Sequence, residues 1–434
     1  MSGHHHAATG LLRLEDALAR MLDGVGPLAA EEVSVDAALG RVLAEDIHAR
    51  DTLPPQDDSA MDGFAVRSID VGAATADAPV VLEVAGEVAA GHVALTSVGP
   101  RTAVRILTGA ALPPGADAVV RVEDTDAPAG VAALPDRVAI RMSVRPGTSV
   151  RPAGSDLRAG DLVLTAGTAI ASRHVAALVA AGRGAVQVHA RPRVAVLATG
   201  DELVPAGAPL DVATIPDSSS AGISAQVADA GGIAVRLGIA ADDRSVIRER
   251  LRAGIASADV VVVCGGVSVG AHDEVRPALD EVGRVDLWRV AVQPGKPLTF
   301  GRASTTDGRT VLLFGLPGNP VSSFVTFELF VRPVLRRLGG RRDLGGRAII
   351  RARLASEASV DPARRGFLRV LVESSDTGAP VARLAGSQGS HVLSGLAASN
   401  GLAIVPEGMG RVEAGTGLDV IVLDESALTS GSHA

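Results

Sequence analysis

Residues 260–266 read Val260-Val261-Val262-Val263-Cys264-Gly265-Gly266, and this stretch decides the fold class of the 434-residue chain. Four consecutive valines are typical of a strand buried on both faces, as in a parallel sheet covered by helices. Strand-like and helix-like segments alternate around it. The predicted strands cover 193–198, 233–239, 285–290 and 311–314, and the predicted helices cover 221–230, 244–256 and 321–338. This alternation predicts a central, doubly wound α/β domain with a mostly parallel sheet over residues 189–338.

The chain outside this region shows other patterns. Leucines at helical spacing over 11–22 predict an amphipathic helix. Residues 33–43 predict a short strand followed by a second helix, and residues 172–181 predict a further helix. Short β-branched runs separated by Gly and Pro turns occupy 60–160 and 345–426. These runs predict a β-rich domain and a C-terminal all-β domain.

The composition excludes several classes of protein. The net charge of −8 argues against nonspecific nucleic-acid binding, because a basic face is what displaces counterions from a polyanion. A single cysteine, Cys264, excludes a disulfide framework and fits a reducing compartment. No run of 18 apolar residues predicts a membrane span, and the first residues lack the pattern of a secretory signal. We interpret His4, His5 and His6 as a tail rather than a metal site, and we predict a cytoplasmic protein without membrane or nucleic-acid partners.

Three glycine-containing loops, over 199–203, 265–270 and 316–320, each follow a predicted strand. In an open α/β sheet, ligands bind beyond the carboxyl ends of the strands. Glycines let backbone amides approach an anion closely, and a following helix N-terminus favours negative charge. Each loop alone is more often a tight turn than a phosphate cradle. Three such loops on one edge predict a pocket that binds phosphate.

Carboxylates gather around the same edge, at Asp201, Glu202, Asp242, Asp243 and Asp273. Asp242 and Asp243 are equally well explained as helix caps. Glu202 and Asp273 lie on the glycine loops, which favours a functional role. Carboxylates beside a phosphate-binding loop indicate Mg²⁺, because hard oxygen ligands bridge this cation to phosphate.

Lys296 is the only lysine among the 41 basic residues of the chain, and it lies in the loop over 293–297. A bias toward arginine codons explains the arginines but not the retained lysine. A compact ammonium group differs from a planar guanidinium fork, so a site can require lysine specifically. We therefore predict a functional role for Lys296.

Seven segments together resemble the molybdopterin molybdenumtransferase family, which includes the C-terminal enzymatic part of gephyrin. They lie at 54–66, 105–110, 154–156, 199–203, 265–270, 294–297 and 316–320, and the first reads Pro-Pro-x-Asp-x-Ser-Ala-Met-Asp-Gly-Phe-Ala-Val. The resemblance spans nearly the whole chain and implies an elongated four-domain subunit that forms a homodimer. It implies that a helix within 11–30 packs on the α/β domain, and that a small α+β domain combines 31–59 with 161–188. The active site would lie between the α/β domain of one subunit and the β-rich domain of the other.

The resemblance also implies roles for residues at matching positions. The catalytic residues would be Asp62, Thr108, Asp156, Glu202, Arg289 and Lys296. The cofactor-binding residues would be Gly200, Asp201, Gly265, Gly266, Ser268, Gly270, Gln293, Pro317, Gly318, Asn319 and Pro320, and the metal ligands Asp242, Asp243 and Asp273. Four positions depart from the family. Gln293 and Arg289 stand where lysine is frequent, Phe64 stands where tyrosine is common, and Ser219 stands where asparagine is common. An oxyanion would therefore depend on Arg289 and Lys296, and no hydroxyl group is required at position 64.

The resemblance implies an enzyme that inserts molybdate into adenylylated molybdopterin with Mg²⁺ and releases AMP. Other proteins of molybdenum-cofactor synthesis are possible partners. Two alternatives stay open at this stage. One is the preceding adenylyl transfer to molybdopterin, which needs only the α/β region. The other is a scaffold that clusters proteins, a use of this fold that gephyrin also shows.

Overall fold

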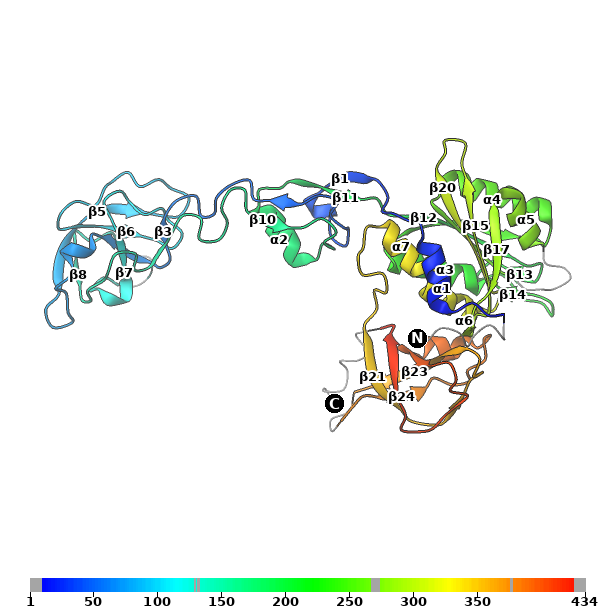
Figure 1. Cartoon of the computed structure of the whole chain (residues 1–434). Helices are drawn as coiled ribbons and strands as arrows, with labels where there is room; N and C mark the ends of the chain where they lie inside the picture. The colour runs from blue at the N-terminus through cyan, green and yellow to red at the C-terminus, as the bar shows by residue number, and fades with distance from the viewer. Residues whose placement is uncertain (1–9, 129, 131–132, 267–273, 375–377, 425–434) are drawn as a thin grey trace, which may run out of the picture.

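A computed structural model of the chain describes residues 10–128, 130, 133–266, 274–374 and 378–424. The predicted site residues Ser268, Gly270 and Asp273 and the run from His4 to His6 lie outside these residues. The molecule is elongated (Figure 1). A β-rich domain lies at one end, a small α+β domain lies in the middle, and the α/β domain and a C-terminal barrel lie together at the other end.

The α/β domain contains a six-stranded sheet in the order β15-β12-β16-β20-β19-β17. The strands are β12 (Arg193–Thr199), β15 (Ile233–Ala240), β16 (Val260–Cys264), β17 (Arg284–Arg289), β19 (Pro297–Ser304) and β20 (Thr310–Leu316). Strands β15, β12, β16 and β20 pair in parallel, and only β19 runs antiparallel to the other strands of the sheet. The prediction of a mostly parallel sheet is confirmed. Because β12, β16 and β20 are adjacent and parallel, the loops that follow them leave the same edge.

Helices cover both faces of this sheet, as the valines of β16 predict. Val260 and Val262 belong to one core cluster, whereas Val261 and Val263 belong to another. The first cluster includes residues of α1 (Leu14–Leu22), α3 (Ser218–Asp229), α6 (Pro320–Thr326), the π-helical turn Phe327–Val331 and α7 (Arg332–Leu338). The second includes residues of α4 (Arg244–Ser257) and α5 (Val275–Val282). Successive side chains of β16 therefore point to opposite faces of the sheet, and each face packs against its own layer of helices.

Three elements of this domain differ from the sequence prediction. Strand β19 and helix α5 were not predicted: β19 begins at a proline, and α5 has only eight residues. The single helix predicted over 321–338 is interrupted by the π-helical turn Phe327–Val331. Pro333 follows this turn and has no backbone N–H, so a regular α-helical hydrogen bond is lost there and the preceding turn widens.

The β-rich domain contains a five-stranded sheet in the order β7-β4-β6-β5-β8. Its strands are β4 (Gly63–Val66), β5 (Val80–Val88), β6 (Thr102–Ile106), β7 (Ala118–Arg121) and β8 (Arg137–Ile140). The chain enters and leaves this sheet through a two-stranded ladder of β3 (Asp58–Ser59) with β9 (Val150–Arg151). Apolar residues are buried on both faces of the sheet. The predicted β character of this region is therefore present in the structure.

The small α+β domain consists of two short ladders and one helix. The ladders join β1 (Ala30–Ser34) to β11 (Ala185–His189) and β2 (Ile47–His48) to β10 (Leu162–Leu164), and the helix is α2 (Ser172–Ala180). The second helix predicted within 33–43 is wrong, because only the single 3₁₀ turn Val35–Ala37 forms. Gly40 has a φ of +78°, and Val42 and Leu43 are used in isolated β-bridges, so too few residues remain for a helix.

The C-terminal domain is a closed barrel. Its strands β21 (Ile349–Leu354), β23 (Arg365–Glu373), β24 (Val381–Leu384), β25 (Gly401–Val405) and β27 (Gly417–Val422) form a ring, because β23 pairs with both β24 and β25. Strand β18 (Val292–Gln293) of the preceding domain adds to β23, and helix α8 (Leu393–Ala397) lies within the barrel sequence. Through β18, the barrel is hydrogen-bonded to a segment next to the predicted site. Among the described residues, no helix is both long enough and apolar enough to cross a bilayer.

Candidate active site

The three glycine loops converge at the carboxyl edge of the sheet. Gly265 has a φ of +109°, and a Cβ at this position would lie only 2.7 Å from the carbonyl oxygen of Thr199. A Cβ on Gly318 would lie 3.6 Å from the Cα of Gly265. The first loop therefore contacts the second, and the second contacts the third. The close approach at Gly265 requires glycine, which explains why this residue type occurs there.

These loops line a cavity of about 780 Å³, here called the main cavity. It lies beyond the carboxyl end of β12, where the strand order reverses between the two neighbours β15 and β16, and this is the usual ligand position in this fold class. The predicted residues that line it are Gly200, Glu202, Asp242, Gly265, Gly266, Pro317, Gly318, Asn319 and Pro320. Asp201 lies next to it and accepts a hydrogen bond from the backbone N–H of Asp242 at 3.1 Å. The predicted pocket is therefore present.

The adjacent acids Asp242 and Asp243 have different environments. The Asp243 carboxylate caps helix α4 by accepting hydrogen bonds from the amides of Ser245 and Val246 at 2.8 and 3.0 Å. A hydrogen bond from the Ser245 hydroxyl group lowers the pKa of Asp243. Burial, followed by repulsion from Asp201 and Glu202, raises the pKa of Asp242. The structure thus assigns the cap to Asp243 and the cavity to Asp242, the acid whose charge is the less stable.

The described residues do not form a complete metal centre. No group of three His, Cys, Asp or Glu side chains in the described part of the chain is arranged to hold a metal ion. Asp201, Glu202 and Asp242 bring negative charge together, but the third predicted ligand, Asp273, lies outside the described residues. Cys264 lines the cavity as well, and burial raises the pKa of its thiol, so the thiol stays protonated at neutral pH.

Arg289 and Lys296 lie at the same edge of the sheet. Arg289 ends β17 and pairs with Pro297, which lines the main cavity. The N–H of Val290 donates a hydrogen bond to the carbonyl oxygen of Lys296 at 2.9 Å. The two predicted cationic residues therefore lie next to the main cavity, although neither side chain lines it.

Gln293 has a different environment from these two residues. Its side-chain oxygen accepts a hydrogen bond from the backbone N–H of Asp361 at 2.8 Å. It lines a second cavity, of about 350 Å³, together with Ser322, Arg364 and Ser390. The glutamine at this position therefore links the α/β domain to the C-terminal barrel.

Asp62 and Thr108 are brought together in the β-rich domain. The Oδ1 atom of Asp62 accepts hydrogen bonds from the amide and the hydroxyl group of Thr108, both at 2.7 Å. These two bonds lower the pKa of Asp62, the backbone bond having the larger effect. Asp62 also lines a cavity of about 290 Å³ with Phe64 and Leu107. The Asp62 side chain is exposed, so this carboxylate is available to a ligand at the surface.

The remaining acids of this region have other positions. Asp58 forms a two-point ion pair with Arg151, at 2.7 and 2.9 Å, and this pair fixes the β3–β9 ladder. Asp156 is exposed on the segment that pairs with Leu53, and no hydrogen bond in the described part of the chain joins it to Asp62 or Thr108. The structure thus unites Asp62 with Thr108 but does not connect Asp156 to them.

The two halves of the predicted site lie apart within one chain. The β-rich domain, with Asp62, and the α/β domain, with the main cavity, are at opposite ends of the molecule (Figure 1). A single subunit therefore does not bring Asp62 to the glycine loops.

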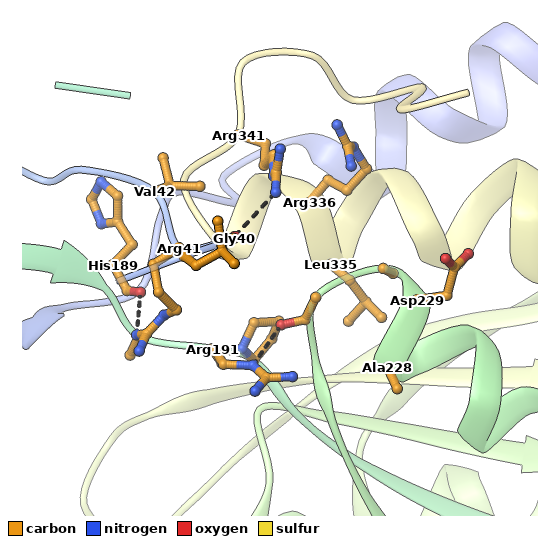
Figure 2. Close-up of a pocket in the computed structure, with 16 residues that line it drawn as sticks. Gly40, Arg41, Val42, His189, Arg191, Ala228, Asp229, Leu335, Arg336 and Arg341 are labelled. Atoms are coloured by element: carbon orange, nitrogen blue, oxygen red, sulfur yellow. Dashed lines mark hydrogen bonds between the residues drawn. The ribbon is translucent and has the colours of Figure 1, made fainter. Parts of the chain in front are cut away.

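Another cavity lies at the junction of the small α+β domain and the α/β domain (Figure 2). It has a volume of about 320 Å³, and no predicted site residue is among those that line it in the described part of the chain. Arg341 donates a hydrogen bond to the carbonyl oxygen of Gly40 at 3.1 Å, and Arg41 donates one to that of His189 at 2.9 Å. These arginines use backbone acceptors to brace the junction, so we interpret the cavity as structural.

Sequence reasoning missed two cavity residues of the C-terminal domain. His391 and Leu393 line the main cavity beside the loop over 316–320. Nothing in the local sequence predicts this position, because it depends on how the barrel docks on the α/β domain. The docking is visible in one hydrogen bond, from the N–H of Val321 to the carbonyl oxygen of Ser390 at 3.1 Å.

The chain is similar to known proteins over most of its length. Three family models match in order: the MoeA N-terminal region (domain I and II) at 12–182, a probable molybdopterin binding domain at 195–337, and the MoeA C-terminal region (domain IV) at 351–423. A molybdopterin molybdenumtransferase from Nostoc sp. is 37% identical over 394 residues, which is 91% of this chain and 88% of that protein. The chain belongs to the molybdopterin molybdenumtransferase family. Membership of this family identifies it as an enzyme, a transferase.

Further relatives agree with this family assignment. Molybdopterin molybdenumtransferase 2 from Mycobacterium tuberculosis is 38% identical over 397 residues, covering 89% of this chain and 94% of that protein. Two solved structures of the MoeA protein from Pyrococcus horikoshii superpose with TM-scores of 0.80 and 0.77 at 31% and 29% identity. Both cover 95% of this chain and nearly all of their own. The predicted multidomain α/β and β architecture is therefore confirmed, as is the predicted family.

Proposed function

We propose that this molybdenumtransferase inserts molybdate into adenylylated molybdopterin and releases AMP. The observation that carries this proposal is the main cavity, where three glycine loops meet at the carboxyl edge of the sheet. A nucleotide-bearing substrate has phosphates, and closely spaced glycine amides suit them. The volume of about 780 Å³ is in the range of small-molecule sites.

The cavity residues have separate tasks in this proposal. The backbone amides around Gly265 and Gly266 hold the phosphates, and Glu202 orients the pterin. Molybdate is a dianion that carboxylates repel, so Arg289 and Lys296 attract it from the rim of the cavity. Their position beside Pro297 supports this division.

Asp62 acts as a carboxylate in this scheme. The hydrogen bonds from Thr108 stabilise the ionised form, so Asp62 is a poor proton donor at neutral pH. We therefore assign it a positioning or proton-accepting role toward the reacting groups. A general-base contribution is typically about 10²–10⁴-fold in rate.

The complete site needs two subunits. The domains that carry Asp62 and the main cavity lie at opposite ends of one chain, so a second subunit has to bring them together (Figure 1). We propose a homodimer in which the β-rich domain of each subunit faces the main cavity of the other. Asp156, which has no hydrogen bond to Asp62 within the described chain, would then meet the substrate directly.

Mg²⁺ stays a separate proposal. Asp242 is the described acid best placed to bind it, and Asp243 is already used as a helix cap. The described residues alone do not complete a ligand set, and the roles proposed for Asp62, Glu202, Arg289 and Lys296 do not depend on the metal. A cytoplasmic location and contacts with other proteins of cofactor synthesis are likewise predictions.

The test is molybdate-dependent release of AMP from purified adenylylated molybdopterin by the full chain. We expect AMP to appear only when molybdate is present. Consumption of ATP with molybdopterin, without molybdate, would instead indicate the adenylyl-transfer reaction. A protein that binds a partner stably and releases no AMP would indicate a scaffold.

A further inference from the structure

The side chains that line the main cavity are unsuited to an anion. The acids among the described lining residues are Glu202, Asp242 and Glu274, and neither lysine nor arginine is found among these described residues. Glu274 is paired with Arg244 at 2.7 Å, which leaves Glu202 and Asp242 without a basic partner in the described part of the chain. A substrate with phosphates therefore meets net negative charge from side chains. Backbone amides and any cationic side chain at the cavity have to offset it.

His391 is the exception in this lining. Among the described residues that line the cavity, its imidazole is the one side chain that can carry positive charge, and it comes from the C-terminal barrel rather than from the α/β domain. A histidine nitrogen donates a hydrogen bond to phosphate in either protonation state, and the bond is stronger when the ring is charged. Arg289 and Lys296 lie beside the cavity, so they do not replace His391 within it.

The segment that carries His391 is held by a buried arginine. Arg369 is fully buried, and it donates hydrogen bonds to the carbonyl oxygens of Ser387 at 2.6 Å and Gly389 at 3.2 Å. Gln388 accepts a hydrogen bond from the Arg369 amide at 2.8 Å. Several bonds thus fix the backbone just before His391.

The histidine ring packs closely over this backbone. A Cβ at Gly389 would lie 3.1 Å from the Cε1 atom of His391, so the absence of a side chain there leaves room for the ring. Ser390 in turn accepts a hydrogen bond from Val321, at the start of helix α6. The exposed side chain of His391 therefore lies beside the third glycine loop. That loop contacts the second loop, where the substrate phosphates are proposed to lie.

We propose that the imidazole of His391 binds a phosphate oxygen of the nucleotide-bearing substrate. This inference rests on the proposed function and adds a residue to its binding site. It gives the C-terminal barrel a direct role in substrate binding: the barrel supplies the cation that the lining of the α/β domain lacks. His391 acts by binding and not by chemistry, so its loss raises KM more than it lowers kcat.

The experiment compares three variants of the full chain. His391→Ala removes both the hydrogen-bond donor and the charge, whereas His391→Arg retains both. His48→Ala is the matched control, because His48 lies in the small α+β domain away from the cavity. Binding of AMP is measured by calorimetry, KM and kcat by release of AMP, and folding by the melting temperature.

We expect His391→Ala to weaken AMP binding and raise KM about tenfold, which corresponds to about 1.4 kcal/mol. His391→Arg should stay within about threefold of the wild type, which is about 0.65 kcal/mol at 25 °C. Unchanged AMP binding and KM in folded His391→Ala would overturn the inference, and so would equal losses in the Ala and Arg variants.

Absence of AMP release from the wild type would show instead that the proposed function is wrong, and the inference would fall with it.

Discussion

Asp62 accepts two hydrogen bonds from Thr108, one from its backbone amide and one from its hydroxyl group, each at 2.7 Å. The two residues are 46 positions apart in the sequence, and strand pairing between β4 and β6 brings them together. Both bonds favour the ionised carboxylate, so the pKa of Asp62 is lowered. The pair thus holds a carboxylate at the exposed surface of the β-rich domain.

This relationship predicts how activity depends on pH. A lowered pKa keeps Asp62 ionised to lower pH than a free aspartate, and ionisation is lost as the pH falls through that value. Thr108→Val removes the hydroxyl donor and retains the backbone bond, so we expect the pKa of Asp62 to rise. The acid limb of the kcat/KM profile should then move to higher pH.

The control for this prediction is Thr108→Ser, which retains the hydroxyl group and should leave the acid limb in place. Titration of ¹³C-labelled aspartate carboxylates by NMR would measure the Asp62 pKa directly. A Thr108→Val enzyme with the wild-type acid limb would show that Asp62 ionisation does not control activity.

The proposed shared site predicts complementation between two inactive chains. Asp62→Asn and Glu202→Gln damage opposite halves of the site, and each homodimer should lose at least about 99% of its activity, in line with the usual contribution of such groups. Random pairing of the two chains makes about half of the dimers mixed, and each mixed dimer has one intact site. Coexpression should therefore restore about a quarter of the wild-type rate of AMP release.

The mixture should stay inactive if both residues act within one chain, since no pairing would then restore an intact site. Two differently tagged chains, purified in tandem, would isolate the mixed dimer. Mixed dimers that form but show no AMP release would contradict the shared site.

The sequence predicted those parts of the fold that local pattern controls. The valines of β16 indicated a strand buried on two faces, and they divide between two core clusters. The glycine loops were predicted from their position after strands, and their meeting follows from the parallel order of β12, β16 and β20. Local spacing was sufficient here because each strand and its loop are contiguous.

The missed features depend on contacts between distant segments. The barrel closes through the pairing of β23 with β25, which no local pattern indicates. His391 reaches the main cavity only because the barrel docks on helix α6. The choice between Asp242 and Asp243 was also open in the sequence. The start of helix α4 decides it, because that helix uses the Asp243 carboxylate as its cap.

These two acids predict opposite effects on stability and activity. Burial and the neighbouring acids destabilise ionised Asp242, which raises its pKa. The free energy of unfolding therefore falls as the pH rises through the pKa of Asp242 and the carboxyl group ionises. We expect Asp242→Asn to be at least as thermally stable as the wild type at pH 7 and to lose most of its activity. Asp243→Asn should lower the melting temperature modestly, because it removes a negative charge from the N-terminus of α4, and should keep most of its activity.

Thermal melting and AMP release, measured on the same preparations, check this pair of predictions. The opposite ranking, with Asp243→Asn inactive and fully stable, would reverse the assignment of the two acids. Equal losses of activity in both variants would mean that the cap and the cavity depend on each other.

A last prediction tests whether the loops require the close approach at Gly265. Gly265→Ala places a Cβ 2.7 Å from the carbonyl oxygen of Thr199. Gly308→Ala is the matched control, because Gly308 also has a positive φ, +82°, but a Cβ there meets no atom within 4 Å. The backbone strain in the control should cost about 1–2 kcal/mol of stability and leave AMP binding unchanged. Gly265→Ala should push the first and second loops apart and weaken AMP binding at least about tenfold. Calorimetric titration of both variants decides the matter: if Gly265→Ala binds AMP as tightly as Gly308→Ala does, contact between the loops does not form the phosphate site.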